Sequence, residues 1–289
     1  MPAVDILSSH QKTVLITGAT SGIGEAAAMR LAESGTRIII GGRNPVKTQT
    51  VVESIRRQTG NQAVESLLAD LSSLAEVRRM ALEFKSRYDR LDVLVNNAGG
   101  FFSQRFTTVD GLERTFALNY LSPFLLTHLL LDVLQDSAPA RIVNVSSMAH
   151  IWGRPHFDDL QSEKTYSGWL AYSRSKMALI YFTYELSRRL AGKNITVNAV
   201  HPGFIKTNLQ NNDRGVFNSL VKALEVFAVQ PAQGAEPLVH LAAAQEVENI
   251  TGQYYSGKAQ KRSHRLSYDQ ETALHLWLVS KDLCGLSGE

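Results

Sequence analysis

Short apolar runs alternate with longer amphipathic stretches along most of this 289-residue chain. Runs rich in Val, Ile and Leu, bounded by Gly, Asn, Asp or Ser, are typical of buried strands. We expect strands at residues 14–17, 37–41, 64–69, 93–96, 141–146, 196–200 and 253–256. Helical spacing of apolar residues separates most of these runs. The pattern therefore predicts an α/β fold, with a doubly wound, seven-stranded parallel sheet and helices on both faces.

Two details refine the expected helices. Ser73 and Glu76 form a capping-box pattern that opens a helix ending near Tyr88. The stretch around Asn119 also has a helical pattern, but Pro123 follows four residues later. Because proline has no N–H and its ring crowds the preceding turn, we expect a kink there that frees the carbonyl of Asn119.

Length and composition indicate a water-soluble globular protein. We find no internal boundary and expect one domain over residues 1–289, with its core at about 11–257 and a C-terminal extension at about 258–289. The net charge of +3 argues against nucleic acid as the main ligand. Cys284 is the only cysteine, which excludes an intrachain disulfide and a cysteine metal cage and suits a reducing compartment.

Two further features bear on location and on charge. No apolar run approaches the roughly 18 residues that span a bilayer, and residues 1–12 lack a signal-peptide core, so we expect a cytoplasmic protein without a membrane span. A basic cluster follows the last expected strand and is either a solvated connection or an anion site. Its members are Lys258, Lys261, Arg262, His264 and Arg265.

A glycine-rich turn follows the first expected strand. Gly18, Gly22 and Gly24 are spaced Gly-x-x-x-Gly-x-Gly, and a helical run and a second strand come next. Glycines at such a turn let the backbone approach a pyrophosphate, which the helix N-terminus then stabilises. The unit therefore predicts a dinucleotide site in a Rossmann fold, with Ser21 and Ile23 among the residues of the turn.

The end of the second strand bears on whether such a dinucleotide site would select NAD or NADP. NAD-selective sites usually place an acidic residue about 20 residues beyond the glycine turn. Here the strand ends Gly41-Gly42-Arg43-Asn44, without a carboxylate. The Arg43 guanidinium matches a 2′-phosphate in a charge-assisted fork, so we expect NADP(H). An ordinary surface arginine is the alternative.

Tyr172 and Lys176 lie four residues apart in a stretch that is apolar at helical spacing and contains no Pro or Gly up to Leu190. Both side chains should therefore project from one face of a helix. An ammonium within about 4 Å of a phenol lowers the pKa of the phenol by roughly 1 to 3 units. We expect Tyr172 to exchange protons near neutral pH. A surface Tyr and Lys on an amphipathic helix would show the same spacing.

The ordered motifs resemble those of the short-chain dehydrogenase/reductase family over about residues 11 to 285. They are Asn96-Asn97-Ala98-Gly99, Asn119, Ser147, Tyr172, Lys176 and Pro202-Gly203. Within that family, Ser146-Ser147-Met148-Ala149-His150, the insert before Tyr172 and Val200-His201-Pro202-Gly203 look most like the retinol dehydrogenase group. Several animal members of that group carry an N-terminal membrane anchor, and the sequence of residues 1–12 differs from such an anchor.

The resemblance implies roles for individual residues. Asn119, Ser147, Tyr172 and Lys176 would be catalytic, with Ser147 polarising the substrate oxygen and Ser146 as its rival. Asp70 would contact the adenine amino group, or it could cap the following helix. The implied cofactor contacts are Gly18, Ser21, Gly22, Ile23, Gly24, Arg43, Asp70, Leu71, Asn97, Ala98, Gly99, Tyr172, Lys176, Pro202, Gly203, Ile205 and Thr207. No metal ligand is expected.

Apolar residues near these motifs point to the substrate class. Phe101, Phe102, His150, Trp152 and Trp169 either line a pocket or belong to the core. Residues 208–230 have apolar positions at helical spacing, which fits the family's substrate lid and equally a core-packed helix. Both interpretations leave the site apolar, so we expect a lipophilic ketone, aldehyde or secondary alcohol as the small-molecule partner.

The resulting hypothesis is an NADP(H)-dependent oxidoreductase of the carbonyl reductase or alcohol dehydrogenase type. The alternative is a redox-silent NADP(H)-binding regulatory or scaffold protein, which would not need Asn119, Ser147, Tyr172 and Lys176 together. By resemblance alone, helices at residues 110–135 and 168–190 would form contacts in a homodimer or homotetramer.

Overall fold

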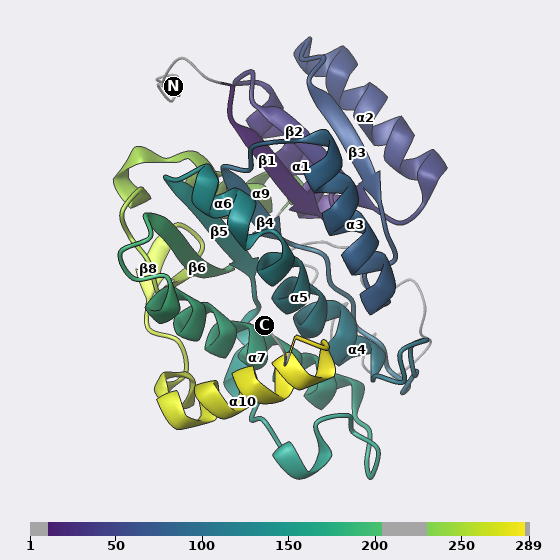
Figure 1. The fold of residues 1–289 in the computed structure, drawn as a ribbon, viewed down its shortest axis with the longest axis vertical. Helices are drawn as coiled ribbons and strands as arrows, with labels where there is room; N and C mark the ends of the chain where they lie inside the picture. The colour runs from purple at the N-terminus through teal and green to yellow at the C-terminus, as the bar shows by residue number, and fades with distance from the viewer. Residues whose placement is uncertain (1–10, 204–229, 287–289) are drawn as a thin grey trace.

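The computed structural model describes residues 11–203 and 230–286. Within them, eight strands form one sheet in the order β3-β2-β1-β4-β5-β6-β7-β8 (Figure 1). The strands are β1 Thr13–Thr17, β2 Arg37–Gly42, β3 Val64–Leu68, β4 Val93–Asn96, β5 Ala140–Val145, β6 Ile195–His201, β7 Gln253–Ser256 and β8 Ala259–Lys261. β1 to β7 run parallel, and β8 is antiparallel to β7.

Helices connect most of the strands, and two more, η7 and α10, follow the last strand. The α-helices are α1 Gly22–Ala32, α2 Pro45–Thr59, α3 Leu74–Arg87, α4 Arg114–Phe116, α5 Ser122–Leu129, α6 Leu131–Asp136, α7 Gly168–Arg189, α9 Pro231–Ala243 and α10 Gln270–Leu283. A π-helical turn, η1, occupies Ala117–Leu121. Short 3-10 helices are η2 Met148–Trp152, η3 Phe157–Asp159, η6 Gln245–Val247 and η7 Arg265–Tyr268.

The expected doubly wound parallel sheet is confirmed, with all seven predicted strands present and their ends shifted by at most one residue. The count of seven was wrong by one, because β8 adds a short antiparallel strand. Its three residues, Ala259–Lys261, are all exposed. They lack the apolar pattern that marks a buried strand. The predicted helix start is also correct, because the Ser73 hydroxyl caps α3 by accepting from the Glu76 N–H.

The core divides into two layers because successive strand residues point to opposite faces of the sheet. On β1, Leu15 faces a cluster formed with α3, α5 and α7, whereas Val14 and Ile16 face a cluster formed with α1, α2 and α9. Figure 1 shows α3, α5 and α7 in front of the sheet and α1 and α9 behind it. Burial on both faces explains why these strands read as continuous apolar runs.

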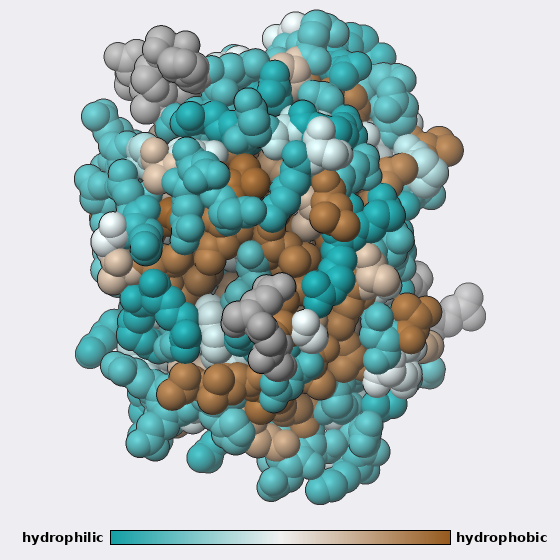
Figure 2. All heavy atoms as spheres, in the orientation of Figure 1, coloured by the Kyte–Doolittle hydropathy of each residue, from teal (hydrophilic) through white to brown (hydrophobic). Residues whose placement is uncertain are grey.

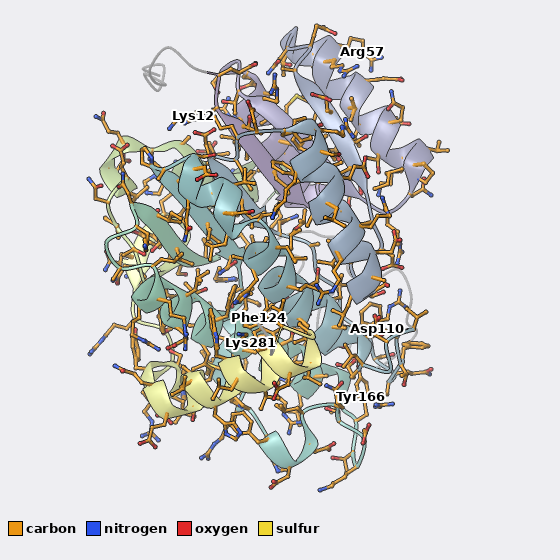
Figure 3. All side chains as sticks on the ribbon, in the orientation of Figure 1. Lys12, Arg57, Asp110, Phe124, Tyr166 and Lys281 are labelled. Carbon is orange, nitrogen blue, oxygen red and sulfur yellow. The ribbon has the colours of Figure 1, made fainter. Side chains whose placement is uncertain are left out.

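The C-terminal helix α10 packs on α5 and α7. The ring of Trp277 lies 5.2 Å from that of Phe124, which Figure 3 labels beside α10, and 5.9 Å from that of Phe182. Hydrophobic atoms are visible among the front helices in Figure 2, and the outer face of α10 exposes Leu274 and Leu278. Part of the α5 and α7 surface that the resemblance assigned to subunit contacts is therefore covered by the chain's own helix.

A buried amide network joins the sheet to α5 and α7. The Asn96 amide on β4 donates to the Thr127 hydroxyl at 3.1 Å and to the Asn144 side-chain oxygen at 2.8 Å. Asn144 on β5 in turn donates to the Thr183 hydroxyl on α7 at 2.9 Å. Buried polar groups require such partners. The network therefore sets the position of α7 relative to the strand ends.

Candidate active site

The helix α7 carries the central pair of the site. The Ser167 hydroxyl caps its start, and the helix continues for 22 residues. Tyr172 and Lys176 share one face, and the Lys176 ammonium lies 5.7 Å from the centre of the Tyr172 ring. The Lys176 ammonium also donates a hydrogen bond of 2.9 Å to the carbonyl of Val145, the last residue of β5. The predicted pair therefore lies at the carboxyl end of the sheet.

The two serines after β5 have different surroundings. Ser146 is buried, and its hydroxyl donates to the main-chain carbonyl of Lys176 at 2.9 Å. The Ser147 hydroxyl instead forms a side-chain hydrogen bond with Tyr172 and accepts from the Ala149 N–H at 3.2 Å. The structure thus brings Ser147, rather than Ser146, to the phenol.

The expectation that Lys176 lowers the pKa of Tyr172 toward neutrality is wrong for this structure. Burial raises the pKa of Tyr172 above its ordinary value, and the hydrogen bond from Ser147 offsets only part of that rise. Burial also lowers the pKa of Lys176 to about 8. Helical spacing identified the shared face, but it carried no information on desolvation or on the Val145 carbonyl that binds the ammonium.

Asn119 lies at the irregular part of the helix before Pro123. A π-helical turn, η1, lies where the kink was expected, and there the Ser122 N–H bonds the Ala117 carbonyl five residues earlier. The Asn119 side chain accepts from the Gly100 N–H at 2.8 Å and donates to the Gly100 carbonyl at 3.0 Å. It also donates to the Ser175 hydroxyl on α7 at 3.0 Å. Asn119 therefore joins the segment after β4 to α7.

The glycine turn between β1 and α1 has room in front of it. Gly22 has φ +60°, and a Cβ added there would meet nothing within 4 Å among the described residues. Gly18 has φ +66°, and a Cβ there would lie only 2.7 Å from Ala98 Cα, so no larger residue fits. The side chain of the N-cap residue Ser21 makes no capping hydrogen bond. These features fit a pyrophosphate at the start of α1.

Asn97 and Thr17 hold this turn against the segment after β4. The Asn97 amide donates to the carbonyls of Thr17 and Gly18, at 2.8 and 3.1 Å. The Thr17 hydroxyl accepts from the N–H groups of Asn97 and Ala98, both at 3.0 Å. Gly99 follows and lies against Asn119 and Lys176. Thr17 was not predicted as a site residue, although its place directly before Gly18 was a signal for such a role.

Arg43 and Asp70 meet beyond the ends of β2 and β3. Their charged groups are 3.7 Å apart, and the Arg43 side chain is 64% exposed. Asp70 accepts from the N–H and the hydroxyl of Ser72, at 3.0 and 2.7 Å. Although partial burial opposes it, these bonds and Arg43 lower the pKa of Asp70. Ser73 caps α3 instead of Asp70, which excludes the capping alternative, and Leu71 beside Asp70 is buried.

The aromatic residues divide between the site and the core. The Phe101 ring lies edge-on to Tyr172 at 6.1 Å, and the rings of Trp152 and Trp169 are 5.4 Å apart. Trp169 precedes Tyr172 by three residues, which places both on the same side of α7. His150 is buried, and Phe102 packs on Phe106.

Some expectations concern other parts of the chain. Pro202 and Gly203 directly follow β6, whereas Ile205, Thr207 and residues 208–229 of the expected lid lie outside the described residues. In residues 11–203 and 230–286, no group of His, Cys, Asp and Glu could hold a metal ion. None of the helices in these two ranges is both long and apolar enough to cross a membrane.

Comparison with known proteins decides the family. Residues 12–215 match the family model of the short chain dehydrogenases. The chain belongs to this family. This short-chain dehydrogenase is similar to human retinol dehydrogenase 13, at 40% identity over 282 residues, which cover 95% of this chain and 85% of that protein. It is also 40% identical to human retinol dehydrogenase 14 over 296 residues, covering 96% and 87%.

Solved structures agree with the family assignment of this short-chain dehydrogenase. A crystal structure of an uncharacterized protein from Mycobacterium paratuberculosis superposes with a TM-score of 0.79 at 34% identity, covering 97% of this chain and 96% of that one. The NADP active-site complex of Pseudomonas aeruginosa RhlG superposes with a TM-score of 0.68 at 29% identity, covering 85% and 94%.

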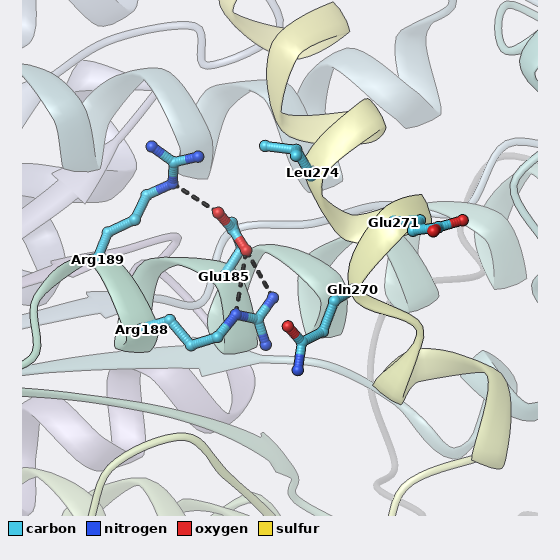
Figure 4. Close-up of a pocket in the computed structure, with 6 residues that line it drawn as sticks. All are labelled: Glu185, Arg188, Arg189, Gln270, Glu271 and Leu274. Carbon is cyan, nitrogen blue, oxygen red and sulfur yellow. Dashed lines mark hydrogen bonds and ion pairs between the residues drawn. The ribbon is translucent and has the colours of Figure 1, made fainter.

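A surface pocket of the short-chain dehydrogenase lies away from Tyr172. Glu185, Arg188, Arg189, Gln270, Glu271 and Leu274 line it (Figure 4). Glu185 accepts from both Arg188 and Arg189, at 2.5 and 2.7 Å, so the two guanidinium groups share one carboxylate. Glu185 is 13 residues beyond Tyr172 on α7, or about 20 Å at the helical rise. The pocket is therefore separate from Tyr172 and Lys176.

The buried ammonium predicts a pH-dependent stability. Because the pKa of Lys176 is about 8 when folded and ordinarily 10.5, the unfolded chain binds more protons between these values. The free energy of unfolding should therefore rise with pH through that window. Relative to Lys176→Met, it should rise by about 2 kcal/mol between pH 7.5 and 10, as measured by urea unfolding. If the free energies of unfolding of the wild type and of Lys176→Met changed in parallel with pH, the assignment of this effect to Lys176 would be wrong. Lys47→Met, on the exposed face of α2, is the matched control and should run parallel to the wild type.

Proposed function

We propose that the protein is an NADP(H)-dependent oxidoreductase that interconverts a lipophilic ketone or aldehyde and its alcohol. The observation that carries the proposal is the contact between the Ser147 hydroxyl and Tyr172, with Lys176 one helical turn further on. Retinol, after which the similar human enzymes are named, is a lipophilic alcohol of this class. The exposed aromatic side chain of Trp152, near the start of α7, supports an apolar substrate.

The residues present fit a nicotinamide dinucleotide. Open space at Gly22 and the N-cap without a side-chain bond suit the phosphates, and the exposed guanidinium of Arg43 suits a 2′-phosphate. Binding roles are proposed for Gly18, Ser21, Gly22, Ile23, Gly24, Arg43, Asp70, Leu71, Asn97, Ala98, Gly99, Tyr172, Lys176, Pro202, Gly203, Ile205 and Thr207. When bound, the cofactor supplies or accepts the hydride.

The surroundings of each side chain give it a separate task. Because the Ala149 N–H occupies a lone pair of the Ser147 oxygen, the Ser147 proton is free to bind the substrate oxygen or Tyr172. The raised pKa of Tyr172 keeps the phenol protonated at neutral pH, so it donates its proton to the oxygen during reduction. Lys176 and Ser147 then stabilise the phenolate, and the reverse steps apply to oxidation. Asn119 holds α7 in place through Ser175.

Replacing Tyr172 tests the proposed acid. Tyr172→Phe keeps the ring and removes the donor, so kcat should fall at least ~10²-fold while NADPH affinity stays nearly unchanged. The assay is a panel of ketones, aldehydes and alcohols with NADPH, NADH and their oxidised forms. Tyr88→Phe is the control, because the Tyr88 hydroxyl bonds Glu65 near the start of β3. Near-normal turnover in Tyr172→Phe would exclude Tyr172 as the acid. A wild-type protein that binds NADPH but turns over no member of the panel would favour the regulatory alternative.

Replacing Arg43 tests the cofactor preference. Arg43→Ala removes two charge-assisted hydrogen bonds to the 2′-phosphate. It should therefore weaken NADPH binding by about 2 kcal/mol, roughly 30-fold, and leave NADH binding nearly unchanged. Arg57→Ala, at the other end of α2, is the matched control and should change neither (Figure 3). Binding is measured by titrating cofactor fluorescence. A wild-type preference for NADH would show that the assignment of Arg43 is wrong.

A further inference from the structure

His150 belongs to the Ser-Ser-Met-Ala-His segment but has no part in the chemistry proposed above. It lies in η2, three residues after Ser147, and is 2% exposed. Its ring makes two hydrogen bonds. Nδ1 lies 2.7 Å from the Ser147 carbonyl oxygen, and Nε2 lies 3.1 Å from the main-chain nitrogen of His264. The ring thus connects the serine to a segment 114 residues further along the chain.

The two partners determine the protonation of the ring. A carbonyl oxygen only accepts a hydrogen bond, and a main-chain N–H only donates one. His150 must therefore carry its proton on Nδ1 and a lone pair on Nε2. Burial lowers the pKa of His150, which keeps this neutral form at neutral pH. Its neighbour His201, at the end of β6, is also neutral because burial lowers its pKa to about 4.

The bonds of His150 complete the fixation of Ser147. The Ser147 carbonyl accepts from the His150 ring and also from the His150 main-chain N–H, at 3.1 Å. The Ser147 hydroxyl accepts from the Ala149 N–H. With both oxygens bonded on the η2 side, the hydroxyl proton is directed to the Tyr172 side.

The far end of the ring is attached to a firmly held segment. Ser263, just before His264, bonds the Tyr184 hydroxyl at 2.6 Å, and Leu266 accepts from the Tyr181 hydroxyl at 2.8 Å. Both tyrosines lie on α7, the helix that carries Tyr172. The segment from Ser263 to Leu266 is therefore bonded to α7 at two points.

We propose that His150 is a positioning residue for the reaction: its Nδ1–H orients Ser147, while its Nε2 anchors η2 to the segment before η7. The proposal rests on the function proposed above, because it concerns the serine of the same site. It assigns different tasks to the two nitrogens, whereas a packing role against the Tyr254 ring, 4.9 Å away, would make no distinction between them.

Two conservative variants separate the tasks. In His150→Asn the amide nitrogen takes the place of Nδ1 and still donates to Ser147, but nothing reaches the His264 N–H. In His150→Gln the side-chain oxygen takes the place of Nε2, and the donor to Ser147 is lost. We expect His150→Asn to retain kcat within about threefold and His150→Gln to lose roughly 10- to 100-fold in kcat with little change in KM. Tyr184→Phe, which loosens the segment without touching Ser147, should retain kcat.

The difference in kcat between the two variants tests whether the two ring nitrogens have different tasks. Equal losses of kcat in His150→Asn and His150→Gln would overturn the proposal, as would retention of kcat in both. Thermal unfolding gives a second comparison. His150→Asn should have the lower midpoint because it leaves the His264 N–H without its partner, whereas in His150→Gln the Ser147 carbonyl keeps the bond from the main-chain N–H of residue 150. The reverse order of midpoints would contradict the anchoring task.

Nitrogen NMR of histidine-labelled wild-type protein tests the bond without any turnover. At pH 7 the signals that disappear in His150→Asn should be those of a neutral ring protonated on Nδ1. A ring protonated on Nε2, or on both nitrogens, would overturn the proposal. A wild-type protein inactive toward the whole substrate panel would instead contradict the proposed function, and the NMR result would still decide the orientation of His150.

Discussion

Lys176 is bonded to the end of β5 through both its main chain and its side chain. Its carbonyl accepts from the Ser146 hydroxyl, and its ammonium donates to the Val145 carbonyl, each at 2.9 Å. These two bonds fix the distance and the rotation of α7 relative to the sheet at the point where Tyr172 projects. Ser147 follows Ser146 directly, so the same contact brings the serine to the phenol.

This arrangement carries a cost in stability. Lys176 is 4% exposed, and no carboxylate among the described residues forms an ion pair with it. Burial of an uncompensated ammonium disfavours its charged form, which is the cause of its lowered pKa. Groups perturbed by burial in this way gather at functional sites. Asn144, bonded to Thr183 on α7, helps the rest of the helix hold that position.

Much of the fold was predictable because its signals are local. The parallel strands are buried on both faces and read as apolar runs, and the spacing of Tyr172 and Lys176 specifies one helical face. The choice of Ser147 over Ser146 followed from the family resemblance and from the position of Ser147 relative to the insert before Tyr172. Exposed β8 escaped prediction because no apolar pattern marks it.

Long-range contacts were not predictable. The raised pKa of Tyr172 depends on burial by the whole fold. The bond from His264 to His150 joins residues far apart in the chain, and neither residue type specifies such a partner. The packing of Trp277 against Phe124 likewise depends on where α10 packs against α5. Such contacts depend on tertiary geometry, which periodicity and spacing do not encode.

The pH dependence of kcat in both directions tests most directly whether a buried, protonated Tyr172 is the acid of the reaction. Reduction needs the neutral phenol and oxidation needs the phenolate. Because burial holds the pKa of Tyr172 above its ordinary value of 10.0, carbonyl reduction should stay level from about pH 5.5 to 7.5, below the pKa of about 8 at which Lys176 loses its charge, while alcohol oxidation keeps rising through that range. A plateau of oxidation near neutral pH, with a matching fall in reduction, would contradict this assignment.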